Sequence, residues 1–197
     1  DEAIETDPTH VRARLNRASI HMASGNAQDA LDDANVLLEL APGLALAKLR
    51  RAEANMMLTN WEAAKDDLEV IIEDAPHHHH ALTQLAACYI SMDRPEKAEA
   101  PLNEALRLAP DHTDAWHQRG LLYLDWGREE AALNDFEAAV RCDGSHLDAR
   151  LHIAAIHHEA KRFVEASGAW KGVLAIEPDH AVARRRKEEC EMAIATM

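Results

Sequence analysis

Thirteen histidines give this chain of 197 residues most of its potential for metal or acid–base chemistry. Four are consecutive in the run His77–His80, and imidazole nitrogens are common zinc ligands. Five recur at multiples of 34 residues, namely His10, His78, His112, His146 and His180. Packed helices lie about 10 Å apart, whereas zinc needs ligands at about 2 Å. We therefore interpret the recurring histidines as polar residues at helix starts and predict no metal site. Whether the run binds a metal is left open.

A second group of ionisable residues comprises Asp148, His152, His157, His158 and Glu159. Two histidines that share one metal in an HExxH motif are four residues apart on a helix, but His157 follows His152 by five. The sequence contains no GxSxG elbow, phosphate loop, dinucleotide fingerprint or recognisable Cys/His nucleophile pair. We therefore predict no catalytic residues and no cofactor.

The elements that would hold these side chains repeat every 34 residues. The clearest marks of the repeat are Pro8, Pro42, Pro76, Pro110, Gly144 and Pro178. Alanine forms a second column with the same period, at Ala30, Ala64, Ala98, Ala132 and Ala166. A fixed period of this length is typical of a solenoid, in which each unit packs on its neighbours.

One repeat carries the fullest set of signature residues, which are Ala115, Trp116, Gly120, Tyr123, Gly127, Ala132, Phe136 and Ala139. In these residues and their spacing the chain resembles the tetratricopeptide repeat family. The resemblance implies an all-α, right-handed superhelical solenoid of five helix-turn-helix repeats plus a C-terminal capping helix. The repeats are expected at 9–42, 43–76, 77–110, 111–144 and 145–178, with the capping helix over 179–197. Residues 1–8 are expected to be the end of a preceding repeat helix in a longer array.

Apolar periodicity and turn residues predict two helices in each repeat. First helices are expected near 11–24, 45–58, 79–92, 113–126 and 147–160. Second helices are expected near 27–40, 61–74, 95–108, 129–142 and 163–176. Pro101 lies inside the expected helix over 95–108, where it removes one backbone hydrogen bond, so we expect a mild kink there.

Composition limits the range of functions. The formal net charge is −14, which argues against nucleic acid as a partner because binding to a phosphate backbone depends on cationic side chains. No apolar run is long enough to span a membrane. We expect a soluble protein, with the cytoplasm as the favoured location. Cys88, Cys142 and Cys190 are too widely spaced for a CxxC metal pair and are expected to be free thiols.

Arginine and aspartate occur together at a spacing of sixteen residues. The pairs are Arg17 with Asp33, Arg51 with Asp67, and Arg119 with Asp135. The third and fifth repeats have Leu85 with Pro101 and Ile153 with Ala169 at these positions. Because the spacing joins the two helices of one repeat, we predict a salt bridge within each of the three charged repeats.

The concave groove of first helices is the expected working surface, since the family resemblance places those helices there. A polar column along it consists of Asn16, Arg50, Gln84, Gln118 and His152. Such side chains can hydrogen-bond the backbone of an extended peptide. The remaining expected peptide-binding residues are Leu49, Met56, Asp114, His117, Leu121, Leu124 and Asp148. The acidic members would favour a partner with a basic segment.

We therefore predict a non-catalytic adaptor that binds a protein or peptide. Three alternatives stay open at this point. The amides could serve only the packing between repeats, the chain could be a structural scaffold that assembles with itself, or it could be a regulatory part of an enzyme outside this sequence. The identity of the partner and the oligomeric state are also left open.

Overall fold

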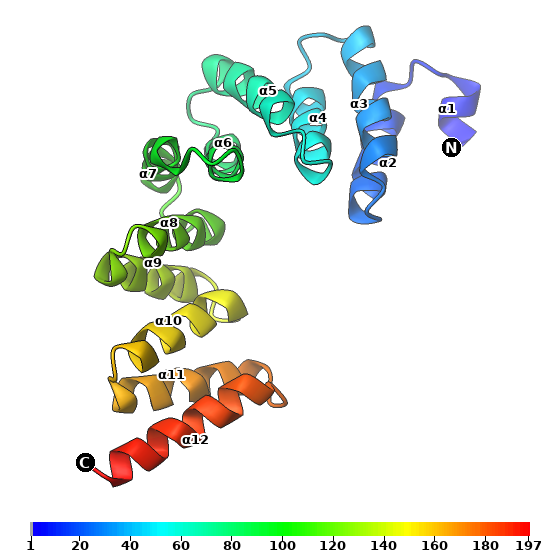
Figure 1. Ribbon diagram of the computed structural model, residues 1–197. Helices are drawn as coiled ribbons and strands as arrows, with labels where there is room; N and C mark the ends of the chain where they lie inside the picture. Colours follow the sequence, from blue (N-terminus) through cyan, green and yellow to red (C-terminus); the bar gives the residue numbers. More distant parts are fainter. Residues whose placement is uncertain (1) are drawn as a thin grey trace. The chain divides into compact units, whose positions relative to one another are not determined.

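The computed structural model describes residues 2–197, which form an all-α solenoid without a β-strand (Figure 1). The first helices of the five repeats are α2 (Val11–Ala23), α4 (Ala45–Met57), α6 (His79–Ser91), α8 (Thr113–Asp125) and α10 (Leu147–Glu159). The second helices are α3 (Ala27–Leu40), α5 (Trp61–Asp74), α7 (Glu99–Leu108), α9 (Glu129–Cys142) and α11 (Phe163–Ile176). Two further helices are α1 (Glu2–Thr6) and α12 (Ala181–Ala195), and one 3-10 turn, η1, covers Pro95–Lys97. Within this described part of the chain, no helix is both long and apolar enough to cross a bilayer.

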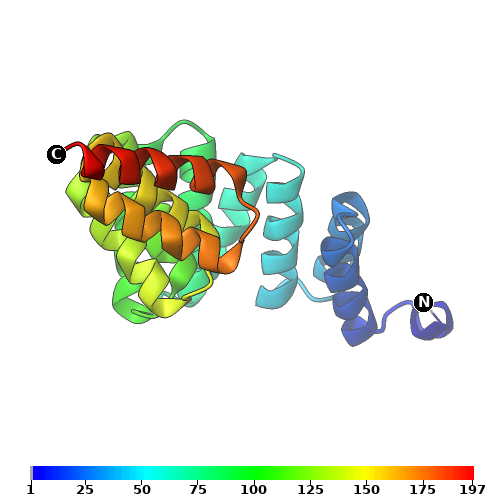
Figure 2. The ribbon, with the colours of Figure 1, turned by 90° about the horizontal axis from the view of Figure 1, so that it is seen from below.

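The chain divides into two compact units, one up to Leu108 and the other Ala109–Met197. In the first unit each helix from α2 to α7 packs on the next, and in the second unit the same holds from α8 to α12. Figures 1 and 2 both show α12 lying beside α11 at the C-terminal end. There Ala183 and Cys190 of α12 join Trp170 and Val173 of α11 in one buried cluster.

Small residues let the helices approach closely, as the alanine columns predict. Ala30, Ala64, Ala98, Ala132 and Ala166 have no exposed surface. The place between α8 and α9 is especially tight, because a Cβ atom on Gly120 would lie 2.7 Å from Cε1 of Phe136. Phe136 is fully buried, so glycine at this position makes room for its ring.

The turn between the two helices of each repeat places one residue in the left-handed region. These residues are Gly25, Thr59, Asp93, Gly127 and Lys161, with φ between 56° and 77°. The next backbone N–H then donates to a carbonyl of the first helix five residues earlier, as from Asn60 to Asn55 at 2.8 Å. This bond closes the helix end, and glycine satisfies the backbone requirement without strain in only two of the five turns.

The helix expected over 95–108 differs from the prediction. Its start is the 3-10 turn η1, and α7 begins only at Glu99. Pro101 has no N–H to donate to the carbonyl four residues earlier, so the α-helical ladder cannot extend back through this turn. Pro101 therefore lies in the first turn of α7, and the irregular geometry precedes it instead of kinking a continuous helix.

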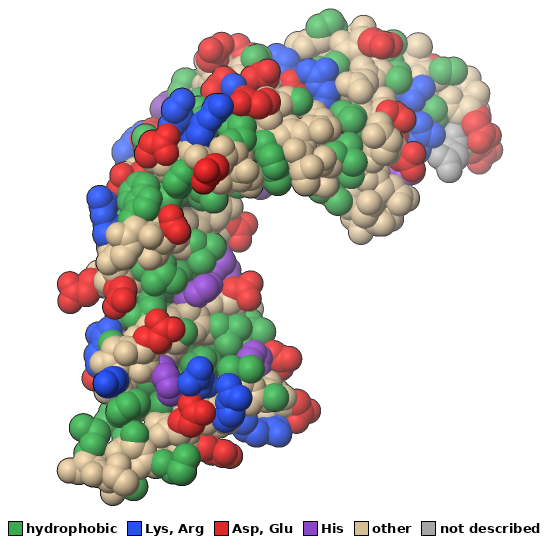
Figure 3. All heavy atoms as spheres, in the orientation of Figure 1, with side chains coloured by type: hydrophobic (Ala, Val, Ile, Leu, Met, Phe, Trp, Pro, Cys, Tyr) green, Lys and Arg blue, Asp and Glu red, His purple; other side chains and the backbone are tan. Residues whose placement is uncertain are grey.

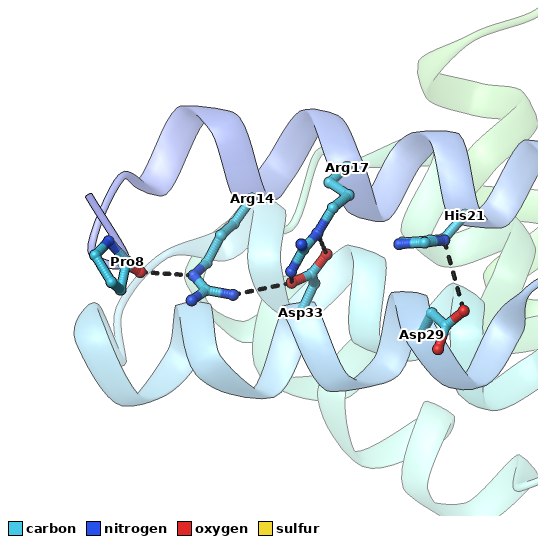
Figure 4. Close-up of polar contacts among 6 residues, drawn as sticks. All are labelled: Pro8, Arg14, Arg17, His21, Asp29 and Asp33. Atoms are coloured by element: carbon cyan, nitrogen blue, oxygen red, sulfur yellow. Dashed lines mark hydrogen bonds and ion pairs between the residues drawn. The ribbon is translucent and has the colours of Figure 1, made fainter. Parts of the chain in front are cut away.

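All three predicted salt bridges are present. The guanidinium of Arg17 donates from Nε and Nη2 to the two carboxylate oxygens of Asp33, at 2.7 and 2.6 Å (Figure 4). The equivalent distances are 2.7 and 2.7 Å from Arg51 to Asp67, and 2.7 and 2.8 Å from Arg119 to Asp135. The aspartates are buried. Each bridge therefore joins the two helices of its own repeat by a bidentate contact.

A second recurring contact fixes the links between repeats. The indole nitrogen of Trp116 donates to the carbonyl of Pro110, six residues earlier, at 2.8 Å. Arginine replaces tryptophan at this position in other repeats and makes the same kind of bond. These bonds are Arg14 to Pro8 (Figure 4), Arg150 to Gly144 and Arg184 to Pro178, at 2.8, 2.9 and 2.7 Å. In these three places arginine thus keeps the N–H donor of the tryptophan, whereas the equivalent position of the third repeat holds Leu82, which has no donor.

Candidate functional site

The recurring histidines lie at helix starts, as interpreted from the sequence. In four of them Nδ1 accepts a hydrogen bond of 3.1 Å from the backbone N–H three residues later, and these are His10, His78, His146 and His180. This bond satisfies one of the amide groups that a helix start leaves without a partner. Across residues 2–197, the structure contains no group of three or more His, Cys, Asp or Glu side chains placed to hold a metal ion.

The first-helix face of the first unit has a polar network around Glu53, a residue that is not among the predicted peptide-binding residues. Arg50 Nη1 lies 2.6 Å from Glu53 Oε2, and Gln84 Nε2 donates to Glu53 Oε1 at 3.3 Å. His80 Nε2 lies 3.6 Å from the same oxygen. Two predicted binding residues are therefore joined across α4 and α6 by one carboxylate.

Glu53 is suited to this role because its side chain is only 14% exposed. Burial raises the pKa of its carboxyl, but hydrogen bonds from His80, Arg50 and Gln84 act more strongly together and hold the pKa below its ordinary value. The carboxylate thus stays ionised at neutral pH. The signal for it in the sequence was its position three residues after Arg50, on the same side of the helix.

Two buried polar atoms of this network, Arg50 Nε and Gln84 Oε1, have no hydrogen-bond partner among the described residues. Buried polar atoms are usually paired, so each exception needs an explanation. If the amides served only the packing between repeats, both polar atoms of Gln84 should be bonded within the chain. Its Nε2 atom is bonded to Glu53, but its Oε1 atom has no partner among the described residues.

The other predicted residues of the first unit have different surroundings. Asn16 is exposed on α2. Leu49 is 9% exposed and belongs to a core cluster, against which Met56 also packs. Leu49 is therefore a packing residue of α4 in this structure, and Met56 is partly covered.

The second unit brings three histidine rings together with Phe136, and we call His117, His146 and His152 the histidine cluster. The ring centroid of His117 lies 4.7 Å from that of His146 and 5.7 Å from that of His152. The ring of His152 stacks on Phe136 at 4.7 Å with an interplanar angle of 14°. Figure 3 shows histidine side chains at the surface of this unit with acidic side chains nearby. His117 and His152 are among the residues predicted from the sequence to bind a peptide, whereas His146 and Phe136 are not.

Polar atoms in and beside the histidine cluster also lack partners within residues 2–197. Nε2 of His117 and Oε1 of Gln118 are buried there without a hydrogen bond. Burial lowers the pKa of both His117 and His152 from the ordinary value of 6.5, so that the two rings are uncharged at neutral pH. Asp114 and Asp148 lie in the first turns of α8 and α10 and act on His117 electrostatically.

The two predicted leucines of α8 differ in exposure. Leu121 is 37% exposed. Leu124 packs against the core cluster formed around Phe136. Leu121 is therefore the more accessible apolar side chain on this face.

Family profiles described as Tetratricopeptide repeat match residues 1–45, 46–78 and 85–151. No curated protein sequence gives a significant match. Among solved structures, TTC0263, a thermophilic TPR protein of Thermus thermophilus, is similar with a TM-score of 0.72 at 20% identity, over 92% of this chain and 99% of that chain.

Two further structures share the architecture. YrrB, described as a TPR protein with an unusual peptide-binding site, has a TM-score of 0.67 at 22% identity, over 95% of this chain and 96% of its own. MamA has a TM-score of 0.64 at 24% identity, over 73% of this chain and 84% of its own. Identities this low establish a common fold alone.

Proposed function

The chain belongs to the tetratricopeptide repeat family, and we propose that it binds an extended segment of a partner protein along the first helices of its repeats. Members of this family are typically non-catalytic interaction modules, and we propose that this chain likewise catalyses no reaction itself. The observation that carries this proposal concerns four of the buried polar atoms that have no partner in the described part of the chain, where His157 Nδ1 and Trp170 Nε1 are two others. The four are Arg50 Nε, Gln84 Oε1, His117 Nε2 and Gln118 Oε1. All four belong to residues selected from the sequence as peptide-binding residues.

An extended peptide suits these atoms, because its backbone offers N–H donors and C=O acceptors at regular intervals. The oxygens of Gln84 and Gln118 would accept from the peptide backbone, and the nitrogen of Arg50 would donate to it. YrrB, which shares this fold, is described as having a peptide-binding site, and this description supports a peptide ligand for the present chain.

Gln84 and Gln118 give the clearest test, because the carbonyl oxygen of each has no partner among residues 2–197. A partner would first be recovered by affinity capture with the intact chain and identified by mass spectrometry. Its binding segment would then be titrated by fluorescence anisotropy. Replacing Gln84 and Gln118 together by Ala should weaken binding by about 1–3 kcal/mol, if each amide makes about one net backbone hydrogen bond.

The matched control changes Asp32 and Asp66 to Asn. These exposed residues lie on the second helices α3 and α5 and are not among the predicted peptide-binding residues. The control should bind with unchanged affinity, and circular dichroism should report the same helicity for both variants. If the control loses affinity and the glutamine variant does not, the second helices are the working surface and the proposal is wrong. Self-association that blocks the segment would instead favour a scaffold.

A further inference from the structure

We propose that the histidine cluster and the two aspartates beside it, Asp114 and Asp148, form a binding site for one Lys or Arg side chain of the partner segment, and that protonation of the histidines releases it. This inference rests on the proposed function, since it names the chemistry and the regulation of one part of the same surface. It concerns the second unit alone.

The geometry collects groups that suit a cation. His117 of α8 lies near both His146, which precedes α10, and His152 of α10, with ring centroids within 5.7 Å. Nε2 of His117 is a buried nitrogen without a partner in the described chain. Asp114 and Asp148 occupy equivalent places in successive repeats, in the first turns of the helices α8 and α10.

Each group contributes a different attraction to a cationic side chain. Uncharged imidazole has one nitrogen that accepts a hydrogen bond, and its partner must be a donor such as ammonium or guanidinium. Carboxylates supply the opposite charge, and guanidinium also stacks on aromatic rings. An anionic ligand fits poorly here, because Asp114 and Asp148 and the overall net charge of −14 would repel it.

Protonation reverses this preference. The titratable groups of the site come from two helices. Helix α8 contributes Asp114 and His117, and α10 with the residue before it contributes His146, Asp148 and His152. The second helix α9 contributes the uncharged ring of Phe136. Burial lowers the pKa of His117, while the neighbouring histidines lower it further and the aspartates raise it. The rings of His117 and His152 are thus neutral at pH 7 and become cationic in mild acid, when they repel Lys or Arg.

The inference can be tested with the capped peptide acetyl-Gly-Ser-Arg-Ser-Gly-amide and the full chain. A matched probe has citrulline, an uncharged isostere, in place of arginine. Titrations followed by the ring signals of the histidines in carbon-proton NMR spectra should shift His117 and His152 with the arginine probe and not with the citrulline probe. Affinity should fall by roughly tenfold or more between about pH 7.5 and 5.5, where arginine keeps its charge.

Two double variants separate the contribution of the aspartates to affinity from the contribution of the histidines to its pH dependence. Asp114→Asn with Asp148→Asn should reduce affinity at the higher pH, whereas Glu129→Gln, which removes a carboxylate from the first turn of α9, should not. His117→Gln with His152→Phe keeps an acceptor and an aromatic stack but cannot be protonated, and should reduce the pH effect to less than about twofold. Circular dichroism at both pH values checks that the chain stays folded.

Two results would overturn the inference. One is an arginine probe that shifts neither His117 nor His152, and the other is a pH effect that persists in the double histidine variant. If the captured partner still needs Gln84 and Gln118 in either case, the proposed function survives without this site. If instead the probe binds at the cluster while the glutamines have no role, the general proposal fails and this site remains.

Discussion

The salt bridge between Arg119 and Asp135 should be more costly to break from the aspartate side than the bridge between Arg51 and Asp67. Asp33 is a separate case, because it also accepts a hydrogen bond from Arg14 at 3.1 Å. The side chains of Arg119 and Asp135 are 17% and 5% exposed, whereas that of Arg51 is 33% exposed. Replacing Asp135 by Ala removes two charge-assisted hydrogen bonds and leaves a largely buried guanidinium without its carboxylate. The free energy of unfolding should then fall by about 3–5 kcal/mol.

The lower end of that range is expected, because Arg119 keeps other contacts. Its guanidinium carbon lies 4.9 Å from the ring centroid of Trp116 and 5.6 Å from that of Tyr123, so cation–π attraction persists. The chain itself supplies a matched apolar pair, because the fifth repeat has Ile153 and Ala169 at the equivalent positions. The double variant Arg119→Ile with Asp135→Ala should therefore regain most of the loss, to within about 1 kcal/mol of the original chain.

Urea unfolding followed by tryptophan fluorescence is the assay. Three of the four tryptophans belong to the second unit, namely Trp116, Trp126 and Trp170. Glu104→Ala, which breaks an exposed pair with Arg107 in the first unit, is the control and should leave the transition almost unchanged. The reasoning is refuted if the single Asp135 variant costs less than about 1 kcal/mol, or if the double variant is as unstable as the single one.

Three further outcomes are expected. Mild acid should destabilise the second unit, because histidines whose pKa is lowered in the folded chain bind protons more readily when the chain is unfolded. The free energy of unfolding should be highest above pH 6.5, the ordinary histidine pKa, and should fall as the pH drops through the folded-state pKa values. A lower urea midpoint would measure this loss. The histidines are His117, His152 and His157. Gly120→Ala should cost about 1–3 kcal/mol by forcing Phe136 to move, and adding Phe136→Leu should relieve part of that cost in thermal unfolding. Thr59→Gly should raise stability by about 1 kcal/mol, since Thr59 has a φ of 60°, while Gly25→Thr should lower it.

Much of the fold could be predicted from the sequence, because each constraint occurs several times at one spacing. Helix boundaries agree with the expected ranges to within about two residues, apart from the helix that contains Pro101. The three Arg–Asp bridges were predictable because loss of the cation coincides with loss of the anion in two repeats. When two helices of one repeat are paired by opposite charges, both charged residues are present or absent together in each copy of the repeat.

Features that depend on side-chain direction were harder to predict. Leu49 precedes Arg50 in the sequence, but consecutive helical residues are about 100° apart, so that one is buried while the other reaches Glu53. The stack of His152 on Phe136 involves helices of different repeats, and a single sequence carries no signal for that pairing. The capping role of the histidines is invisible in composition, because it depends on one ring nitrogen turning back to an amide.

The bond from Trp116 or its arginine replacements to the link carbonyl bears on how such an array can grow. Both ends of the bond lie within seven consecutive residues, as in Trp116 with Pro110 and Arg150 with Gly144. A gene duplication that copies one repeat with its link therefore also copies the contact that sets the direction of the incoming helix. Tryptophan and arginine are interchangeable at these links because each places an N–H donor on the link carbonyl.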